Sequence, residues 1–234
     1  MQLPTSKTPV SKCTALGRFA AAMLGKFTNK PALLSLAASI AAATDSLEAA
    51  QGAYAGSVLA LVIPRVGVRY NDYVSDNVVR ALQRQAEMFD GKRGGATGSF
   101  LFPDGVTPIV RPVGKTQVDA MQLIEGRLDA LASWPDAAAE KAKLSAARAS
   151  YAAALSDRDA AMLATAALRA KRDAAKEDFL DVYASVAAKV KSEFPRDRPM
   201  QDLFFDKVTD AVVADDEEPA DDPTPPAPPA PPPA

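Results

Sequence analysis

The sequence contains no histidine, and this absence limits its possible chemistry more than any residue that is present. Histidine is the commonest general base, the commonest zinc ligand and the base of Ser-His and Cys-His dyads. Di-iron sites of the Glu-x-x-His kind are excluded for the same reason. No other group of side chains matches a catalytic, metal-binding or nucleotide-binding motif. We therefore expect a protein that is not an enzyme and uses no cofactor or metal.

Cysteine and aromatic residues are also scarce. Cys13 is the only cysteine, so a disulfide within the chain is excluded. Aromatic residues make up 6% of the sequence, whereas hydrophobic residues make up 48%, and much of that content is alanine. Alanine favours helix but buries little area per residue. The composition thus predicts long alanine-rich helices that pack closely along their length.

Glycine and proline are absent from Asp136 to Phe194, where alanine, leucine and charged residues dominate. This composition predicts one very long helix. The alternative is a hairpin, because Ser156-Asp157-Arg158-Asp159 has the pattern of a capping box that starts a new helix. No glycine lies nearby to make the turn, so we prefer the uninterrupted helix.

A second long helix is predicted from Pro31 to Phe89. Five large side chains in it recur at seven-residue intervals, as in a coiled coil: Leu33, Ile40, Leu47, Tyr54 and Leu61. Pro64 and Gly67 interrupt the pattern, so a kink or short break is expected there.

Shorter elements are expected around these helices. One helix is predicted from residue 14 to Phe27 and another from about Thr116 to Ser133. The intervening GKRGGATG, at 91–98, has the composition of a loop. Two short β segments are predicted near 99–111, joined by a Pro-Asp-Gly turn. A further β segment is a weaker expectation near 203–213, where no turn-forming glycine is present.

The two halves of the sequence resemble each other. A shift of 104 residues brings Pro31 onto Pro135, and LFPDGVTPIV at 101–110 aligns without gaps with LFFDKVTDAV at 203–212. A shared bias toward alanine cannot produce the second match. We infer an internal duplication of a short-helix/long-helix unit. The expected fold is mainly all-α, an elongated antiparallel four-helix bundle formed by the two copies.

This duplication defines the expected domains. Residues 1–13 form a flexible arm, residues 14–112 the first helical repeat and residues 113–213 the second repeat, which packs with the first into one body. Residues 214–234 combine an acidic run with a proline-rich sequence that cannot bury a core. We expect a disordered tail there.

The preferred function is that of a non-enzymatic structural or protein-interaction bundle, with a protein partner or self-association. The candidate partner-binding residues are the large apolar side chains of the repeated LF segments: Phe100, Leu101, Phe102, Leu203, Phe204 and Phe205. The competing interpretation is that these side chains pack under the helix ends and stabilise the bundle.

An alternative function is binding of nucleic acid or another anionic surface. Five basic residues precede the first acidic residue, Asp45, and form the candidate anion-binding set: Lys7, Lys12, Arg18, Lys26 and Lys30. The acidic tail would then modulate that binding by competing for them.

Neither an export signal nor a membrane span is expected from the sequence. Residues 32–63 are long and apolar enough to cross a bilayer, but they include Asp45 and Glu48. We interpret the stretch as a packed helix, and the default expectation is a cytoplasmic protein.

Overall fold

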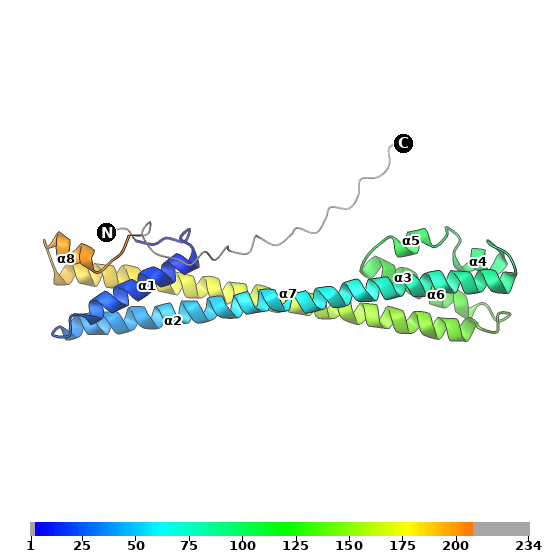
Figure 1. The fold of residues 1–234 in the computed structure, drawn as a ribbon, viewed down its shortest axis with the longest axis horizontal. Coiled ribbons are helices and arrows are strands. Elements are labelled where there is room, and N and C mark those ends of the chain that lie inside the picture. Colours follow the sequence, from blue (N-terminus) through cyan, green and yellow to red (C-terminus); the bar gives the residue numbers. More distant parts are fainter. Residues whose placement is uncertain (1–2, 208–234) are drawn as a thin grey trace, which may run out of the picture. The chain divides into compact units, whose positions relative to one another are not determined.

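The computed structural model describes residues 3–207, and over this range it contains helices and no strand (Figure 1). The helices are α1 (Val10–Gly25), α2 (Pro31–Ala60), α3 (Val62–Asp90), α4 (Ala96–Leu101), α5 (Thr107–Val110), α6 (Lys115–Asp129), α7 (Ala137–Glu193) and α8 (Arg198–Leu203). The mainly all-α prediction is confirmed. The predicted tail, 214–234, lies outside the described residues.

The chain divides into two compact units. Among the described residues, unit 1 comprises 3–51 and 172–207, and unit 2 comprises Gly52–Lys171. Because the boundaries fall inside α2 and α7, each of these helices contributes residues to both units. The units therefore differ from the predicted sequence repeats, since each contains parts of both.

The longest element, α7, is a single helix of 57 residues. Its first turn is closed by the Glu140 N–H, which donates to the Asp136 carbonyl at 2.9 Å. The helix continues through Ser156 without a turn. The prediction of one uninterrupted helix is therefore confirmed, and the alternative of a hairpin is wrong. Alanine, which has the highest helix propensity, is the commonest residue of α7 on both sides of Ser156.

The predicted interruption of the second long helix lies at Leu61, between α2 and α3. Pro64 explains it, because proline has no N–H to donate to the carbonyl of Ala60, four residues earlier. The Leu61 N–H is shared between the carbonyls of Ser57 and Val58, both at 3.2 Å. Gly67, in contrast, lies inside α3 without breaking it.

Unit 1 packs α1 against the first part of α2 and the last part of α7 (Figure 1). The buried apolar residues of this core include Leu16, Leu24, Leu33, Ile40, Leu47, Phe179, Tyr183, Val186 and Val190. Aromatic rings close one end. The Phe204 ring lies 4.9 Å from Phe27 and 5.6 Å from Phe194, measured between ring centroids.

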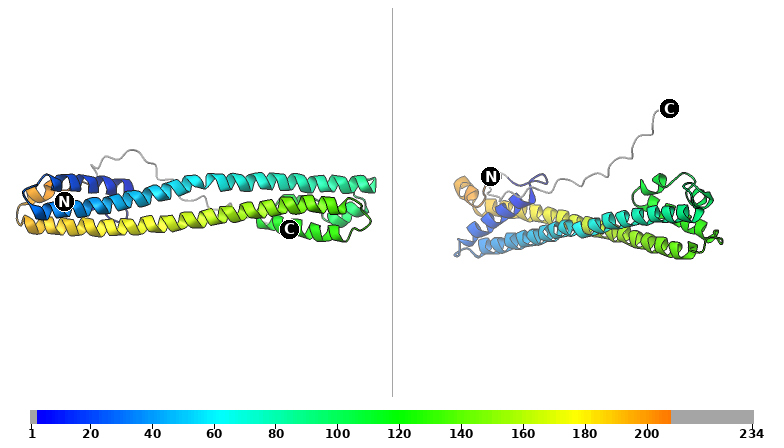
Figure 2. Two further views of the ribbon diagram at one scale, coloured as in Figure 1. Left: turned by 90° about the horizontal axis from the view of Figure 1, so that it is seen from below. Right: turned by 45° about the vertical axis from the view of Figure 1, so that its right-hand side comes forward.

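Unit 2 packs α3, α6 and the first part of α7, and the short helices α4 and α5 lie against α3 and α6 (Figure 2). Its larger core includes Val79, Leu82, Leu101, Met121, Ile124, Leu128, Trp134 and Leu144. A smaller cluster joins Val68 of α3 to Val118 of α6 and to Tyr151 and Leu155 of α7.

The predicted β segments near 99–111 are wrong, because α4 and α5 occupy that stretch. The Asp90 carboxylate caps α4 by accepting the N–H groups of Thr97, at 3.2 Å, and Gly98, at 3.0 Å. These bonds lower the pKa of Asp90. Pro108 lies in the first turn of α5, a position that proline favours. The described part of 203–213, up to Lys207, likewise contains no strand.

The first helix begins earlier than predicted, at residue 10 and not at residue 14. α1 begins at Val10, and Cys13 is completely buried in the unit 1 core. Val10, Cys13 and Leu16 follow one another at three-residue spacing and share one helix face. Burial raises the pKa of the Cys13 thiol.

Gly17 in α1 provides a test of the unit 1 packing. A Cβ atom at Gly17 would overlap Thr44 Oγ1 and lie 2.8 Å from Phe179 Cε2. Gly17→Ala should therefore lower the free energy of unfolding by about 1–3 kcal/mol, although alanine favours helix. Urea denaturation measures the change.

The matched control is Gly126→Ala in α6, where a Cβ atom meets nothing within 4 Å. It should raise stability by about 0.5–1 kcal/mol through helix propensity alone. Equal effects of the two substitutions would contradict the close packing at Gly17.

Candidate functional site

The six candidate partner-binding residues divide into buried and exposed members. Leu101, Phe102, Phe204 and Phe205 lie in the two cores, whereas Phe100 and Leu203 are about half exposed. In unit 1, the Phe205 ring also packs edge-on against Tyr183, with centroids 5.5 Å apart. The four buried side chains contribute to helix packing. Only Phe100 and Leu203, of the six, are therefore accessible to a partner.

Truncation of Phe204 should reveal this packing role. Phe204→Ala removes a completely buried ring that contacts Phe27 and Phe194, and we expect the free energy of unfolding to fall by about 3–5 kcal/mol. The neighbouring Leu203→Ala should have a much smaller effect, since Leu203 is exposed. Thermal unfolding followed by circular dichroism compares the two variants. Equal losses of stability would contradict a packing role for Phe204.

The candidate anion-binding residues all lie in unit 1, and two of them already bind carboxylates. Arg18 contacts Glu48 at 2.5 Å and Asp45 at 2.6 Å. Lys30 Nζ contacts Glu193 at 3.0 Å and lies 4.3 Å from the centroid of the Phe194 ring. Lys7 and Lys26 are exposed, whereas Lys12 is half-buried and interacts with another group. The structure therefore does not gather these five charges into one free cluster.

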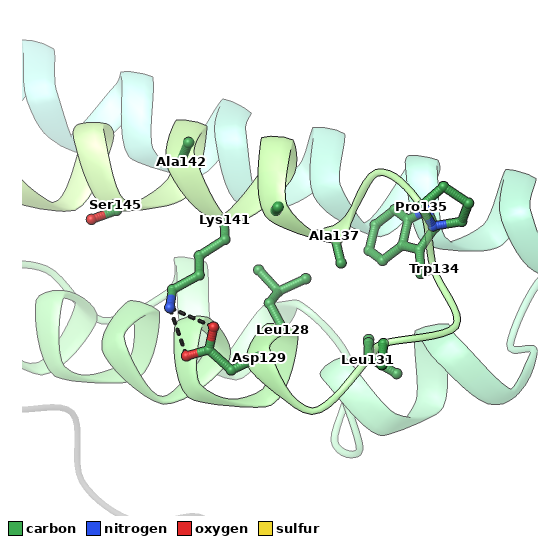
Figure 3. A pocket seen from close by; sticks show the side chains of 11 residues that line it. Leu128, Asp129, Leu131, Trp134, Pro135, Ala137, Lys141, Ala142 and Ser145 are labelled. Atoms are coloured by element: carbon green, nitrogen blue, oxygen red, sulfur yellow. Dashed lines mark hydrogen bonds and ion pairs between the residues drawn. The ribbon is translucent and has the colours of Figure 1, made fainter.

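A surface hollow of about 660 Å³ lies where α6 leads into α7 (Figure 3). Leu128, Leu131, Trp134 and alanines line it, and its charged groups, Lys141 and Asp129, pair at 2.6 Å. Trp134 is itself buried and stacks on Phe89. The hollow thus offers a neutralised ion pair and aliphatic walls, without convergent polar groups that a specific ligand would require.

A partly buried set of polar contacts, which we call the polar network, joins α3, α6 and α7 in unit 2. The Tyr151 hydroxyl of α7 donates to Asp72 Oδ1 of α3 at 3.0 Å and accepts the Gly114 N–H at 2.7 Å. One turn further along α3, Asp76 Oδ1 accepts the side-chain N–H of Gln117 in α6 at 2.7 Å. Sequence analysis did not identify this network, because its members are far apart in the chain.

Burial shifts the protonation of this network. Desolvation raises the pKa of Tyr151 to about 12, aided by the Asp72 carboxylate. Desolvation also raises the pKa of Asp76, with Asp72 adding repulsion, while Gln117 and Arg80 act in the opposite direction. Tyr151, like an unshifted tyrosine, is protonated at neutral pH, so its hydroxyl can donate the hydrogen bond to Asp72. Neither Tyr151 nor Asp76 faces the hollow at Trp134, so the network's evident role is to orient the three helices.

Asp76 gives unit 2 a pH-dependent stability. Its folded-state pKa exceeds the unfolded value, so folding favours the protonated acid, and stability falls as pH rises from the unfolded pKa through the folded one. Asp76→Asn keeps an oxygen acceptor for Gln117 without the charge. We expect its stability relative to wild type to be greater at pH 7 than at pH 3, as measured by urea unfolding.

The control for this comparison is Asp119→Asn, which removes an exposed ion pair with Lys115. Its effect should be only a few tenths of a kcal/mol. An Asp76→Asn difference that is the same at both pH values would rule out the ionisation argument.

Exposed large apolar side chains form a stripe on the end of α2 and the start of α3. We define the apolar stripe as Leu59, Val62, Ile63, Val66, Tyr70 and Tyr73. Their three- and four-residue spacing places them on one helix face. Each side chain is between 56% and 79% exposed. A core residue of an amphipathic helix is normally covered, so this face lacks a partner within the described residues.

The stripe belongs to a part of unit 2 in which residues are at most half-buried. No residue is buried in 52–67 or in 156–171, which we call the bare segments. Figure 2 shows them running alongside each other, with the short helices of unit 2 packed elsewhere. Leu163 of α7 adds another highly exposed large side chain. Sequence analysis treated this stretch as packed helix, because its apolar pattern alone does not reveal which face is covered.

Comparison of the chain with protein-family models, curated proteins and solved structures finds no match. By length and composition, the stretch Pro31–Asp90 is apolar enough to cross a membrane, and little of its most apolar part is buried. Among the described residues, no group of three or more Cys, Asp or Glu side chains is arranged to hold a metal ion.

Proposed function

We propose that this chain is a non-enzymatic protein-interaction protein that docks a partner on the apolar stripe. The exposure of six large side chains on one helix face is the observation that supports this function most directly. Scattered exposed apolar residues are normal on a protein surface, whereas a contiguous stripe marks an interaction site.

The stability of the helices supports the same proposal. Most helices in proteins are stabilised by packing of an apolar face and not by helix propensity alone. The bare segments have apolar faces but no buried residue. A bound partner would supply the missing packing and would be favoured by the area it removes from water.

We also propose that the chain arose by internal duplication, and the burial pattern supports it. The buried residues of α3 are Val68, Ser75, Val79, Leu82 and Ala86, and the residues 104 positions later, Arg172, Phe179, Tyr183, Val186 and Val190, are all buried in α7. Four of the five buried residues of α2 behave in the same way: Leu33, Leu36, Ile40 and Leu47 correspond to the buried Ala137, Glu140, Leu144 and Tyr151. The fifth, Thr44, corresponds to the half-buried Arg148.

Contacts at equivalent positions give independent support. Phe89 stacks on Trp134 in unit 2, with centroids 6.0 Å apart, and Lys30 lies over Phe194 in unit 1. Phe89 and Phe194 end the two long helices, while Lys30 and Trp134 are 104 residues apart and precede them. Each long helix is followed by a six-residue helix, α4 or α8, that ends at a leucine with a phenylalanine directly after it.

On this proposal, each unit takes a short helix and the start of a long helix from one repeat, and the end of a long helix from the other. Such an exchange fits the expected antiparallel packing of two long helices. The assembly of both units into one four-helix bundle remains a prediction.

Anion binding is a weaker candidate, because Arg18 and Lys30 would first have to leave their carboxylates. A mobility-shift assay at low salt addresses it directly, since electrostatic binding to nucleic acid weakens steeply as salt increases. The protein-interaction proposal expects no shift in that assay.

Affinity capture from an extract of cells that express the chain tests the docking function. The test variant is Leu59→Ser/Ile63→Ser, which removes two stripe side chains without touching a core. The control is Val113→Ser/Leu123→Ser, two side chains of unit 2 outside the stripe that are each 66% exposed. We expect a polypeptide that is captured by wild type and control but lost, by about tenfold or more, with the test variant. Identical capture by all three would exclude the stripe as a docking site.

A further inference from the structure

We propose that the partner docked on the apolar stripe is a second copy of this chain, an inference that rests on the proposed function and specifies its partner. The first argument concerns the direction in which the stripe faces. The half-buried positions of 52–67, such as Ser57, Leu61 and Pro64, share the opposite face of the helix, so the stripe points away from them and is left uncovered among the described residues. A second copy can lay an identical stripe against the first, and each then covers the other.

The size of the stripe matches such an interface. Six large side chains, all more than half exposed, present roughly 700 Å² of accessible surface, close to the ~800 Å² that each partner contributes to a standard interface. The stripe is also suited to self-pairing. Aliphatic residues, Leu59 to Val66, occupy one end and Tyr70 and Tyr73 the other. In an antiparallel two-fold pair, the tyrosines of each copy pack on the aliphatic end of its partner.

Glycines preceding the stripe permit close approach. Gly52 and Gly56 lie four residues apart, and a Cβ atom at either position would meet nothing within 4 Å. Together with Leu59 and Ile63 they continue one face of α2 at three- and four-residue spacing. The backbone of another helix can therefore approach α2 closely beside the stripe.

Sedimentation equilibrium over a range of protein concentrations tests the proposal with the full chain. Wild type should be a dimer, and the Leu59→Ser/Ile63→Ser variant should raise the dimer dissociation constant by about 100-fold or more. The Val113→Ser/Leu123→Ser control should remain a dimer. Circular dichroism on the same samples establishes that each variant is folded.

Cysteine cross-linking locates the interface, because the native Cys13 is buried. Val66→Cys, in the middle of the stripe, should give a disulfide-linked dimer on oxidation with copper phenanthroline. Val113→Cys, which has similar exposure in unit 2, should not. Equal cross-linking of the two variants would overturn the proposed interface.

A folded wild-type chain that is monomeric at all concentrations would overturn the second-copy inference, as would a dimer insensitive to the stripe variant. Stripe-dependent binding of a monomer to vesicles of anionic lipid would also overturn it and assign the stripe to a membrane surface. The affinity capture distinguishes failure of the second-copy inference from failure of the proposed docking function. A monomer that still captures another polypeptide through the stripe retains the protein-interaction function, whereas a monomer that captures none loses both.

Discussion

The packing of apolar helix faces is the constraint on which this protein depends, because helix propensity alone rarely stabilises a helix in water. In unit 1, the faces of α1, α2 and α7 meet around Phe179 and Tyr183, and in unit 2 those of α3, α6 and α7 meet around Met121 and Leu144. The bare segments contain half-buried residues but no fully buried core. The proposed docking function follows from this difference between covered and uncovered parts of the same helices.

The two cores differ in how they tolerate polar groups. Where unit 1 buries Leu47 and Phe179, the positions 104 residues away in unit 2 are Tyr151 and Ser75. Tyr151 satisfies its hydroxyl through Asp72 and the Gly114 N–H, whereas the buried Ser75 Oγ finds no partner among the described residues. Buried polar networks restrict the arrangement of the helices that share them, at a cost in desolvation. Under the proposed duplication, unit 2 thus has an orienting network at positions where unit 1 has aliphatic and aromatic packing.

Helical periodicity and composition predicted the long elements well, because the absence of Gly and Pro from 136–194 leaves few alternatives to α7. Pro64 similarly placed the break between α2 and α3 within a few residues. The β prediction near 99–111 failed because the Asp90 carboxylate caps α4. Asp90 lies outside the stretch from which β structure was predicted, so the pattern within that stretch did not include this contact. The exposed stripe could not be found from the sequence either, since Ile63 and Leu47 look equally suited to a core until their neighbours are known.

Hydrogen exchange at the amides of the bare segments, measured as a function of protein concentration, tests the central claim most directly. If a second copy supplies the missing packing, protection at 52–67 and 156–171 should be low in dilute protein and rise as the dimer forms. Amides in the cores, such as those of Leu82 and Val186, should be protected throughout. Protection of the bare segments that equals the core value and does not change with concentration would contradict the account.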